Sequence, residues 1–228
     1  VRQAVITSQN TAFAAMASKL DLCAIRDTAA SFGVHRADGT ELLYVPATIL
    51  GTNEIAPLTM AAAYAGISNN GTVCSPVAID RVILRGSNEE LEVPKTICSQ
   101  AVSPDIAHAM VEALRGVVSG GTGAAARALG RPAAGKTGTS QSNASAWFSA
   151  YTPQLAASVA LFRDSASESL NGIGGLTSVT GGTFPARIWT AFMKGALKGQ
   201  PVMSFPAPAN VGGLDPIVMT SGGVQTRK

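Results

Sequence analysis

Three β-like runs in the second half of the chain set the strongest limit on its fold. They lie near residues 133–140, at Ser145–Tyr151 and at Leu155–Arg163, and only Thr152-Pro153-Gln154 separates the last two. So short a turn joins antiparallel neighbours, whereas parallel strands need a long crossover connection. The sequence therefore predicts that the last two runs form an antiparallel pair.

Helical patterns flank these runs. The clearest one has Ser103 as N-cap and Pro104 as first residue, and it presents an apolar stripe that ends at Gly120-Gly121. Further helices are predicted after Asn10, from about Leu22 to Phe32, from Pro57 to the Asn69-Asn70-Gly71 stop, and from about Pro185 to Leu197. Helices and antiparallel strands thus occur in one chain.

The remaining segments are predicted to be loops and a hairpin. Residues 34–55 have no sustained periodicity and are expected to form a long ordered loop. Residues 73–93 change to a β-hairpin pattern around a turn at 85–88, with Cys74 and Cys98 at the two open ends. Residues 201–228 are rich in Pro, Gly and Ser, so they are expected to form a tail or linker after one domain at 1–200.

Composition excludes several classes of protein. Of the 228 residues, 46% are hydrophobic and 14% are charged, which suits a buried core and not a disordered chain. The net charge of +3 comes from scattered single residues, so no nucleic-acid partner is expected. The cysteines and histidines lack zinc-site spacing, and neither a metal nor another cofactor is expected. The longest strongly apolar stretch, Leu155 to Phe162, is far shorter than the roughly 20 residues of a membrane-spanning helix.

The sharpest candidate for chemistry is Gly135-Lys136-Thr137-Gly138-Thr139-Ser140, which lies on a predicted strand. An ammonium group with hydroxyl donors on extended backbone can bind a carboxylate, and Gly138 allows another chain to approach closely. The alternative is a solvated edge strand on which the lysine discourages aggregation. Serine acyl transferases combine such a K-T-G with an S-x-N motif and an S-x-x-K motif that carries the nucleophile. The presence of either motif elsewhere in the chain would favour the functional interpretation.

An S-x-N motif occurs at Ser8-Gln9-Asn10, where a helix–helix connection could project its side chains into a cleft. The alternative for Ser8 and Asn10 is an ordinary helix N-cap. Ser68-Asn69-Asn70 also fits the spacing, but with Gly71 it is better explained as a helix end.

With these motifs in place, the chain resembles the C-terminal part of the transpeptidase domain of bifunctional (class A) penicillin-binding proteins, of an actinobacterial type. The resemblance covers about residues 1 to 205. It rests on motifs in the same order and spacing: residues 8–13, 50–54, 57–61, 63–65, 136–139, 146–148, 151–153 and 181–186, with Trp189. It implies an α+β, three-layer αβα fold of the penicillin-binding protein and serine β-lactamase type, which is incomplete in this chain.

The resemblance also implies a function and roles for residues. The complete enzyme would cross-link peptidoglycan stem peptides that end in D-Ala-D-Ala, and it would bind β-lactam antibiotics covalently. Ser8, Asn10 and Lys136 would be catalytic. Thr137, Gly138 and Thr139 would bind the substrate, because the two hydroxyls hold its terminal carboxylate and the strand backbone docks the peptide.

The nucleophile is absent, because no S-x-x-K occurs in the 228 residues. In the family this motif lies upstream of S-x-N, together with two strands that would pair with the run Leu155–Arg163. We therefore expect the chain to be inactive alone and to be completed by an upstream segment, which brings the nucleophile and a glycosyltransferase domain. The alternatives are a related serine β-lactamase and a non-catalytic binding module.

The family implies a location at the extracytoplasmic face of the cell membrane, with an anchor in the upstream segment. An oxidising location permits disulfides, so we expect Cys74 and Cys98 to be bonded across the predicted hairpin. Cys23 is then left over as a small, buried residue.

Overall fold

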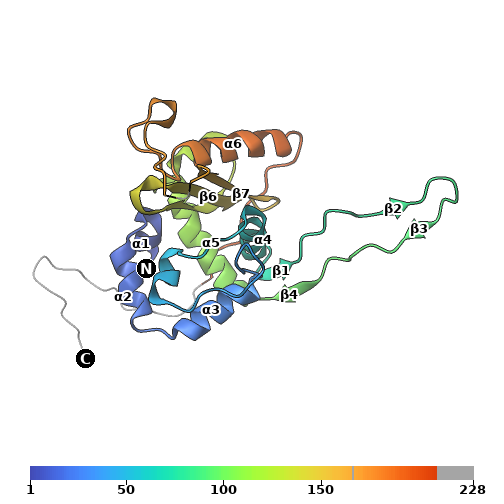
Figure 1. Ribbon diagram of the computed structural model, residues 1–228, viewed down its shortest axis with the longest axis horizontal. Coiled ribbons are helices and arrows are strands. Elements are labelled where there is room, and N and C mark those ends of the chain that lie inside the picture. The colour runs from blue at the N-terminus through green and yellow to red at the C-terminus, as the bar shows by residue number, and fades with distance from the viewer. Residues whose placement is uncertain (166, 210–228) are drawn as a thin grey trace, which may run out of the picture.

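The computed structural model describes residues 1–165 and 167–209 and is built around a three-stranded sheet (Figure 1). Its strands β5 (Ala134–Thr139), β6 (Ser145–Tyr151) and β7 (Ala156–Phe162) lie side by side in this order, and both pairs are antiparallel. The predicted antiparallel pair is confirmed, and the motif strand β5 joins it at one edge.

One face of the sheet is covered by α6 (Phe184–Ala196). Successive strand residues point to opposite faces, and Phe148 of β6 points towards this helix. There it packs edge-on against the fully buried Trp189, with 5.4 Å between the ring centroids. The Trp189 indole also donates a hydrogen bond of 3.1 Å to the Ala150 carbonyl, so α6 is fixed to the sheet by packing and by a directed polar contact.

The other face is covered by α4 (Pro57–Ser68) and α5 (Pro104–Ser119), which pack around the buried Tyr151. Both helices begin at the prolines expected from the sequence, and the Ser103 hydroxyl caps α5 by accepting a hydrogen bond from the Ile106 amide. Helices on both sides of the sheet make the three layers of the predicted αβα arrangement.

Three short helices begin the chain. They are α1 (Arg2–Thr7), α2 (Asn10–Ala17) and α3 (Leu22–Ser31). The last two correspond to the predicted helices. The first was not predicted, because its six residues are too few to show a helical period and no side chain caps it.

A long hairpin arm extends from the body of the molecule (Figure 1). At its base, β1 (Thr72–Cys74) pairs with β4 (Cys98–Gln100), and near its tip β2 (Val82–Ile83) pairs with β3 (Glu90–Leu91). The hairpin and its turn were predicted. The β pattern over 73–93 overstates the pairing, which is restricted to these two short ladders.

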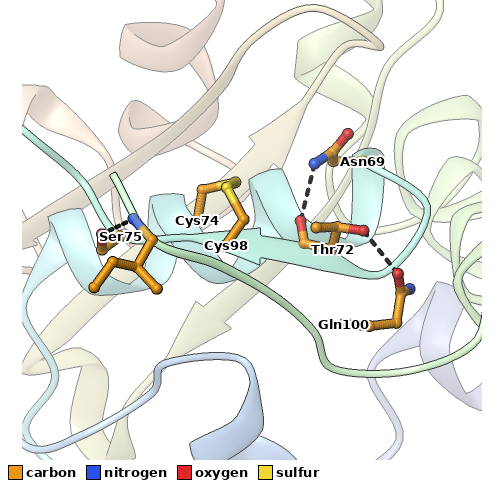
Figure 2. Close-up of a disulfide and its surroundings, with 7 residues drawn as sticks. Asn69, Thr72, Cys74, Ser75, Cys98 and Gln100 are labelled. Carbon is orange, nitrogen blue, oxygen red and sulfur yellow. Dashed lines mark hydrogen bonds between the residues drawn. A yellow bond between two sulfur atoms is a disulfide. The ribbon is translucent and has the colours of Figure 1, made fainter. Parts of the chain in front are cut away.

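A disulfide closes the base of this arm (Figure 2). Cys74 and Cys98 are directly opposite each other in the β1–β4 register, and their sulfur atoms are bonded, as expected. Two residues earlier on β1, the Thr72 hydroxyl donates a hydrogen bond of 2.8 Å to the Gln100 side chain. Cys23 is free, but it is half-buried and not buried as expected.

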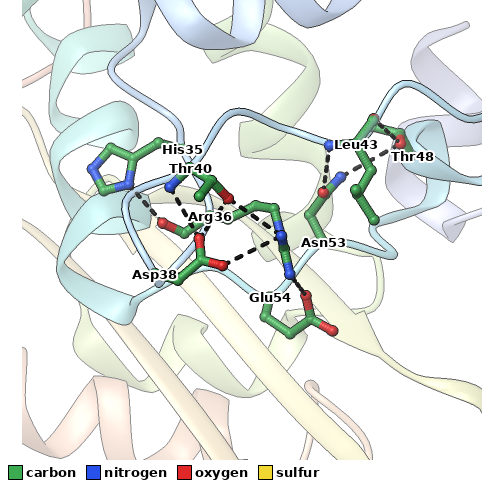
Figure 3. Close-up of polar contacts among 8 residues, drawn as sticks. All are labelled: His35, Arg36, Asp38, Thr40, Leu43, Thr48, Asn53 and Glu54. Atoms are coloured by element: carbon green, nitrogen blue, oxygen red, sulfur yellow. Dashed lines mark hydrogen bonds and ion pairs between the residues drawn. The ribbon is translucent and has the colours of Figure 1, made fainter.

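The predicted loop at residues 34–55 is ordered by its own polar side chains (Figure 3). Its one helical turn is a 3₁₀ helix, η1 (Pro46–Leu50). Arg36 forms ion pairs of 3.3 Å with both Asp38 and Glu54, which ties the start of the loop to its end. The Asn53 side chain accepts a hydrogen bond from a backbone amide within the loop, so side chains replace the regular hydrogen bonding that the segment lacks.

The predicted tail at 201–228 begins with residues that contact the body. Arg131 donates hydrogen bonds to the carbonyls of Leu197, Gln200 and Pro201, and the Phe205 ring packs edge-on against Tyr151. Residues 210–228 lie outside the described part of the chain. Within the described part, no helix has the length and apolar character needed to cross a membrane.

Candidate active site

The predicted motif residues lie on an open edge of the sheet. Among the described residues, β5 pairs only with β6, so its other edge has no strand partner. Lys136 is opposite Ser149 on the face covered by α4 and α5, whereas Thr137 is opposite Phe148 on the α6 face. The motif therefore presents a cation on one face of an accessible strand and hydroxyls on the other.

Ser8 and Lys136 are brought into direct contact. Ser8 lies in the connection between α1 and α2, where it ends α1 in the left-handed conformation with φ 56° and ψ 52°. The Lys136 ammonium donates hydrogen bonds to Ser8 Oγ at 2.7 Å and to the Thr137 carbonyl at 2.9 Å. Two motifs that are 128 residues apart in sequence thus meet at one point.

The Lys136 ammonium is partly buried and has no acidic partner among the described residues. Partial burial lowers the pKa of Lys136 from 10.5 to about 8, because removal of water disfavours the ammonium form. None of the ion pairs within the described residues involves Lys136. The side chain is therefore partly dehydrated, held by two neutral oxygens and unneutralised, which suits it to attract an anion.

Close backbone packing fixes the position of Ser8. Ile6, two residues before it, lies against α5 and the turn that follows α5. A Cβ atom at Gly116 would overlap the Ile6 side chain, and one at Gly121 would overlap the Ile6 carbonyl. The same carbonyl accepts a hydrogen bond of 3.2 Å from the Thr122 amide. Two glycines thus allow α1 to approach closely enough for Ser8 to reach Lys136.

The other predicted site residues are in different environments. Asn10 is the first residue of α2 and is exposed, and its side chain forms no hydrogen bond within the described residues. Thr139 is also exposed, and its hydroxyl accepts a hydrogen bond of 3.2 Å from the Gly181 amide. A Cβ at Gly138 would lie 3.3 Å from that of Trp147, which is tight packing.

Thr137 is almost buried, with 9% of its surface exposed. Its hydroxyl lies 2.6 Å from that of Thr122, a residue that the sequence did not single out. Thr122 follows Gly120-Gly121, which indicated only the end of a helix. A threonine there belongs to no motif, so only the folded arrangement reveals that it adjoins the site.

A comparison with known proteins decides the family. The model of the penicillin binding protein transpeptidase domain matches residues 1–166 of this chain. The chain belongs to this family. This match confirms the predicted resemblance to the transpeptidase domain of penicillin-binding proteins.

Individual members of the family show how much of such a protein is present. Penicillin-binding protein 1A of Neisseria lactamica is 34% identical over 168 residues, which are 71% of this chain and 20% of that protein. The protein of the same name from Clostridium botulinum is 32% identical over 216 residues, 92% of this chain and 25% of that protein. The chain therefore spans about a fifth to a quarter of these penicillin-binding proteins.

A solved structure agrees in fold over nearly the whole chain. PonA1 from Mycobacterium tuberculosis, in complex with penicillin V, has a TM-score of 0.80 and 26% sequence identity. The match covers 96% of this chain and 62% of that one. The predicted α+β fold of penicillin-binding proteins is therefore confirmed over nearly the whole chain.

Proposed function

We propose that this chain supplies the S-x-N and K-T-G part of a serine DD-transpeptidase that cross-links peptidoglycan stem peptides. The observation that carries the proposal is the 2.7 Å hydrogen bond from the Lys136 ammonium to Ser8 Oγ, beside an open strand edge. The sequence contains no S-x-x-K, so the nucleophilic serine comes from a segment upstream of this chain. By itself the chain is inactive.

In the reaction, the donor stem peptide lies along the free edge of β5 and adds to the sheet as a strand. The upstream serine attacks the D-Ala-D-Ala amide carbonyl, and the upstream lysine of S-x-x-K accepts the serine proton. Ser8 relays this proton: its hydroxyl donates to the departing D-Ala amine as the amide bond breaks, and it regains a proton from the upstream lysine, which becomes neutral again. An amine from a neighbouring stem peptide then attacks the acyl-enzyme carbonyl. As the new amide bond forms and the ester bond to the serine breaks, the proton lost by this amine passes to the departing serine oxygen.

Lys136, Asn10 and the K-T-G strand orient this substrate. The unneutralised ammonium of Lys136 provides a positive potential for the terminal carboxylate, which hydroxyls of Thr137 and Thr139 also help to hold. Gly138 leaves the strand surface open to the peptide. The exposed amide of Asn10 is free to hydrogen-bond the peptide backbone and the upstream lysine.

The same site would react with β-lactams, since these antibiotics mimic the D-Ala-D-Ala amide and its carboxylate. Residues 1–200 would form the C-terminal portion of the transpeptidase domain, with 201–228 as a tail or linker. The upstream segment would also contribute a glycosyltransferase domain and the anchor that holds the enzyme at the extracytoplasmic face of the membrane.

Labelling with a fluorescent penicillin, followed by intact-mass analysis, tests the proposal. This chain alone should remain unlabelled, and the chain joined to its upstream segment should gain one acyl adduct on the upstream serine. Ser8→Ala should slow acylation at least tenfold, because it removes the proton relay. Ser18→Ala, which removes an exposed hydroxyl at the end of α2, should not.

Two results would contradict the proposal. Rapid turnover of a chromogenic cephalosporin would identify a β-lactamase, because that enzyme hydrolyses its acyl intermediate. No adduct on the completed protein would identify a non-catalytic binding module.

A further inference from the structure

The side chains of Thr122 and Thr137 are in contact, but they differ in how far they are buried. Thr122 is exposed on the turn after α5, whereas Thr137 on β5 is almost buried, and their oxygens are 2.6 Å apart. This geometry allows either hydroxyl to donate to the other. The direction of this hydrogen bond determines whether the Thr122 proton or the Thr137 proton remains available to a ligand.

The need to satisfy buried donors determines that direction. Thr122 is the only hydrogen-bond partner of the Thr137 hydroxyl among the described residues. If Thr122 were the donor, the nearly buried Thr137 proton would be left without an acceptor, which costs free energy. If Thr137 donates instead, its proton is satisfied, and the remaining proton belongs to the exposed Thr122.

The position of Thr122 places this proton at the proposed carboxylate site. The turn at Gly181-Gly182 contacts both sides: the Gly181 amide donates to the Thr139 hydroxyl, and a Cβ at Gly182 would overlap the Thr122 carbonyl. On its other side, Thr122 is tied by its amide to Ile6, two residues from Ser8. Thr122 therefore lies between the Ser8 connection and the K-T-G strand.

We propose that Thr122 is a carboxylate-binding residue of this site, with its hydroxyl proton donated to the terminal carboxylate of the substrate. The single hydroxyl proton of Thr137 is donated to Thr122, so Thr137 helps to hold the carboxylate through Thr122 and not by donating to it directly. The Thr139 oxygen accepts from Gly181, and its proton has no acceptor among the described residues, so Thr122 and Thr139 together offer two hydroxyl donors. The inference rests on the proposed function and adds a residue outside the S-x-N and K-T-G motifs.

The test compares acylation of the completed protein by benzylpenicillin, which has a free carboxylate, and by its methyl ester, which has none. Thr122→Val keeps the shape of the side chain and removes the donor, so it should lower the second-order acylation rate constant for benzylpenicillin about tenfold. The rate constant for the ester should be unchanged. Thr122→Ser, which keeps the hydroxyl, should restore the rate with benzylpenicillin.

The outcomes separate this inference from the proposed function. An equal loss with acid and ester would mean that Thr122 only supports the fold, and no loss with either would mean that it does not bind the carboxylate; each result overturns the inference alone. No acylation of the unmutated completed protein by either compound would overturn the proposed function, and the inference with it. Should Thr122→Val fail to fold, Thr122→Ala removes the same donor without the branched side chain.

Discussion

Lys136 shows how burial at a single residue sets both charge and stability. Its ammonium group is partly dehydrated beside Ser8, and this lowers the pKa of Lys136 to about 8. The group is therefore charged at neutral pH but close to losing its proton. A site that depends on this charge must respond to pH in the mildly alkaline range.

We predict that acylation of the completed protein by benzylpenicillin falls as pH rises through about 8, because Lys136 loses the charge that attracts the carboxylate. The free energy of unfolding should change with pH in the opposite direction to the acylation rate. Between pH 8 and 10.5 the unfolded chain holds the lysine proton more tightly than the folded chain does, so the free energy of unfolding contributed by this group rises with pH.

A pH–rate profile and urea unfolding at pH 7.5 and 10 measure these two effects. Lys136→Met should remove both dependences, whereas Lys194→Met, at an exposed lysine on α6, should retain them. An unchanged pH–rate profile in Lys136→Met would show that another group is responsible.

Gly121 provides a second prediction at this scale. Gly121→Ala places a methyl group against the Ile6 carbonyl, so α1 must move away from α5 and Ser8 must move away from Lys136. We expect a loss of about 1–3 kcal/mol in stability, as for other overpacked sites, and slower acylation of the completed protein.

The matched control is Gly120→Ala at the adjacent position, where a Cβ would meet no atom within 4 Å. Thermal unfolding and acylation rates of the two variants check the prediction. Similar behaviour of both variants would show that close packing at Ile6 does not position Ser8.

The site residues differ in how far sequence reasoning could reach them. Ser8 and Lys136 belong to short motifs whose residue types state their chemistry, and the structure brings these two side chains together. Thr122 has no such signature. The role that we propose for it follows from the burial of Thr137, a property of the folded chain that no local sequence pattern indicates.

At the scale of elements, strong local signals were reliable and weak ones were not. Capping and an apolar stripe located α5, and a three-residue turn between β-like runs located β6 and β7. α1 was missed because six residues hold too little periodicity, and its helical form depends on packing against α5. The hairpin pattern overestimated pairing because β propensity does not report which backbone groups meet.

The disulfide at the base of the hairpin arm permits a prediction at this scale. The bond links residues separated by 24 positions, so it restricts the unfolded chain. We expect Cys74→Ser with Cys98→Ser to lower stability by about 3 kcal/mol and to speed proteolysis within the arm. Cys23→Ser, at the free cysteine, should change neither.

Urea unfolding and limited proteolysis under non-reducing conditions measure these effects. Unchanged cleavage of the arm in the double variant would mean that the β1–β4 ladder holds the base without the disulfide.

At the scale of the whole molecule, the sheet has two open edges within the described residues. β5 and β7 each pair only with β6. We propose that substrate binds at the β5 edge and that strands from the upstream segment pair with the β7 edge. An open edge of an apolar strand can pair with a second molecule. The β7 edge is therefore available for self-association when no upstream strand covers it.

We therefore predict that the chain alone self-associates through β7 and that the upstream segment suppresses this. Phe162 is the last residue of β7 and is 63% exposed. Phe162→Lys should reduce association, because it adds a charge to this edge. Phe192→Lys, on α6 with 56% exposed, should have less effect. Sedimentation velocity over a range of concentrations measures the species present, and a strictly monomeric chain would contradict the prediction.

The backbone of Ser8 has a further consequence. Its φ of 56° places a non-glycine residue in the left-handed region, which is unfavourable for a side chain with a Cβ atom. Glycine would relieve the local strain at this helix end but would remove the hydroxyl that contacts Lys136. At position 8, the residue that best suits the backbone is therefore glycine, whereas the proposed chemistry needs serine. Selection for thermal stability alone would favour glycine here, and the enzyme would lose activity.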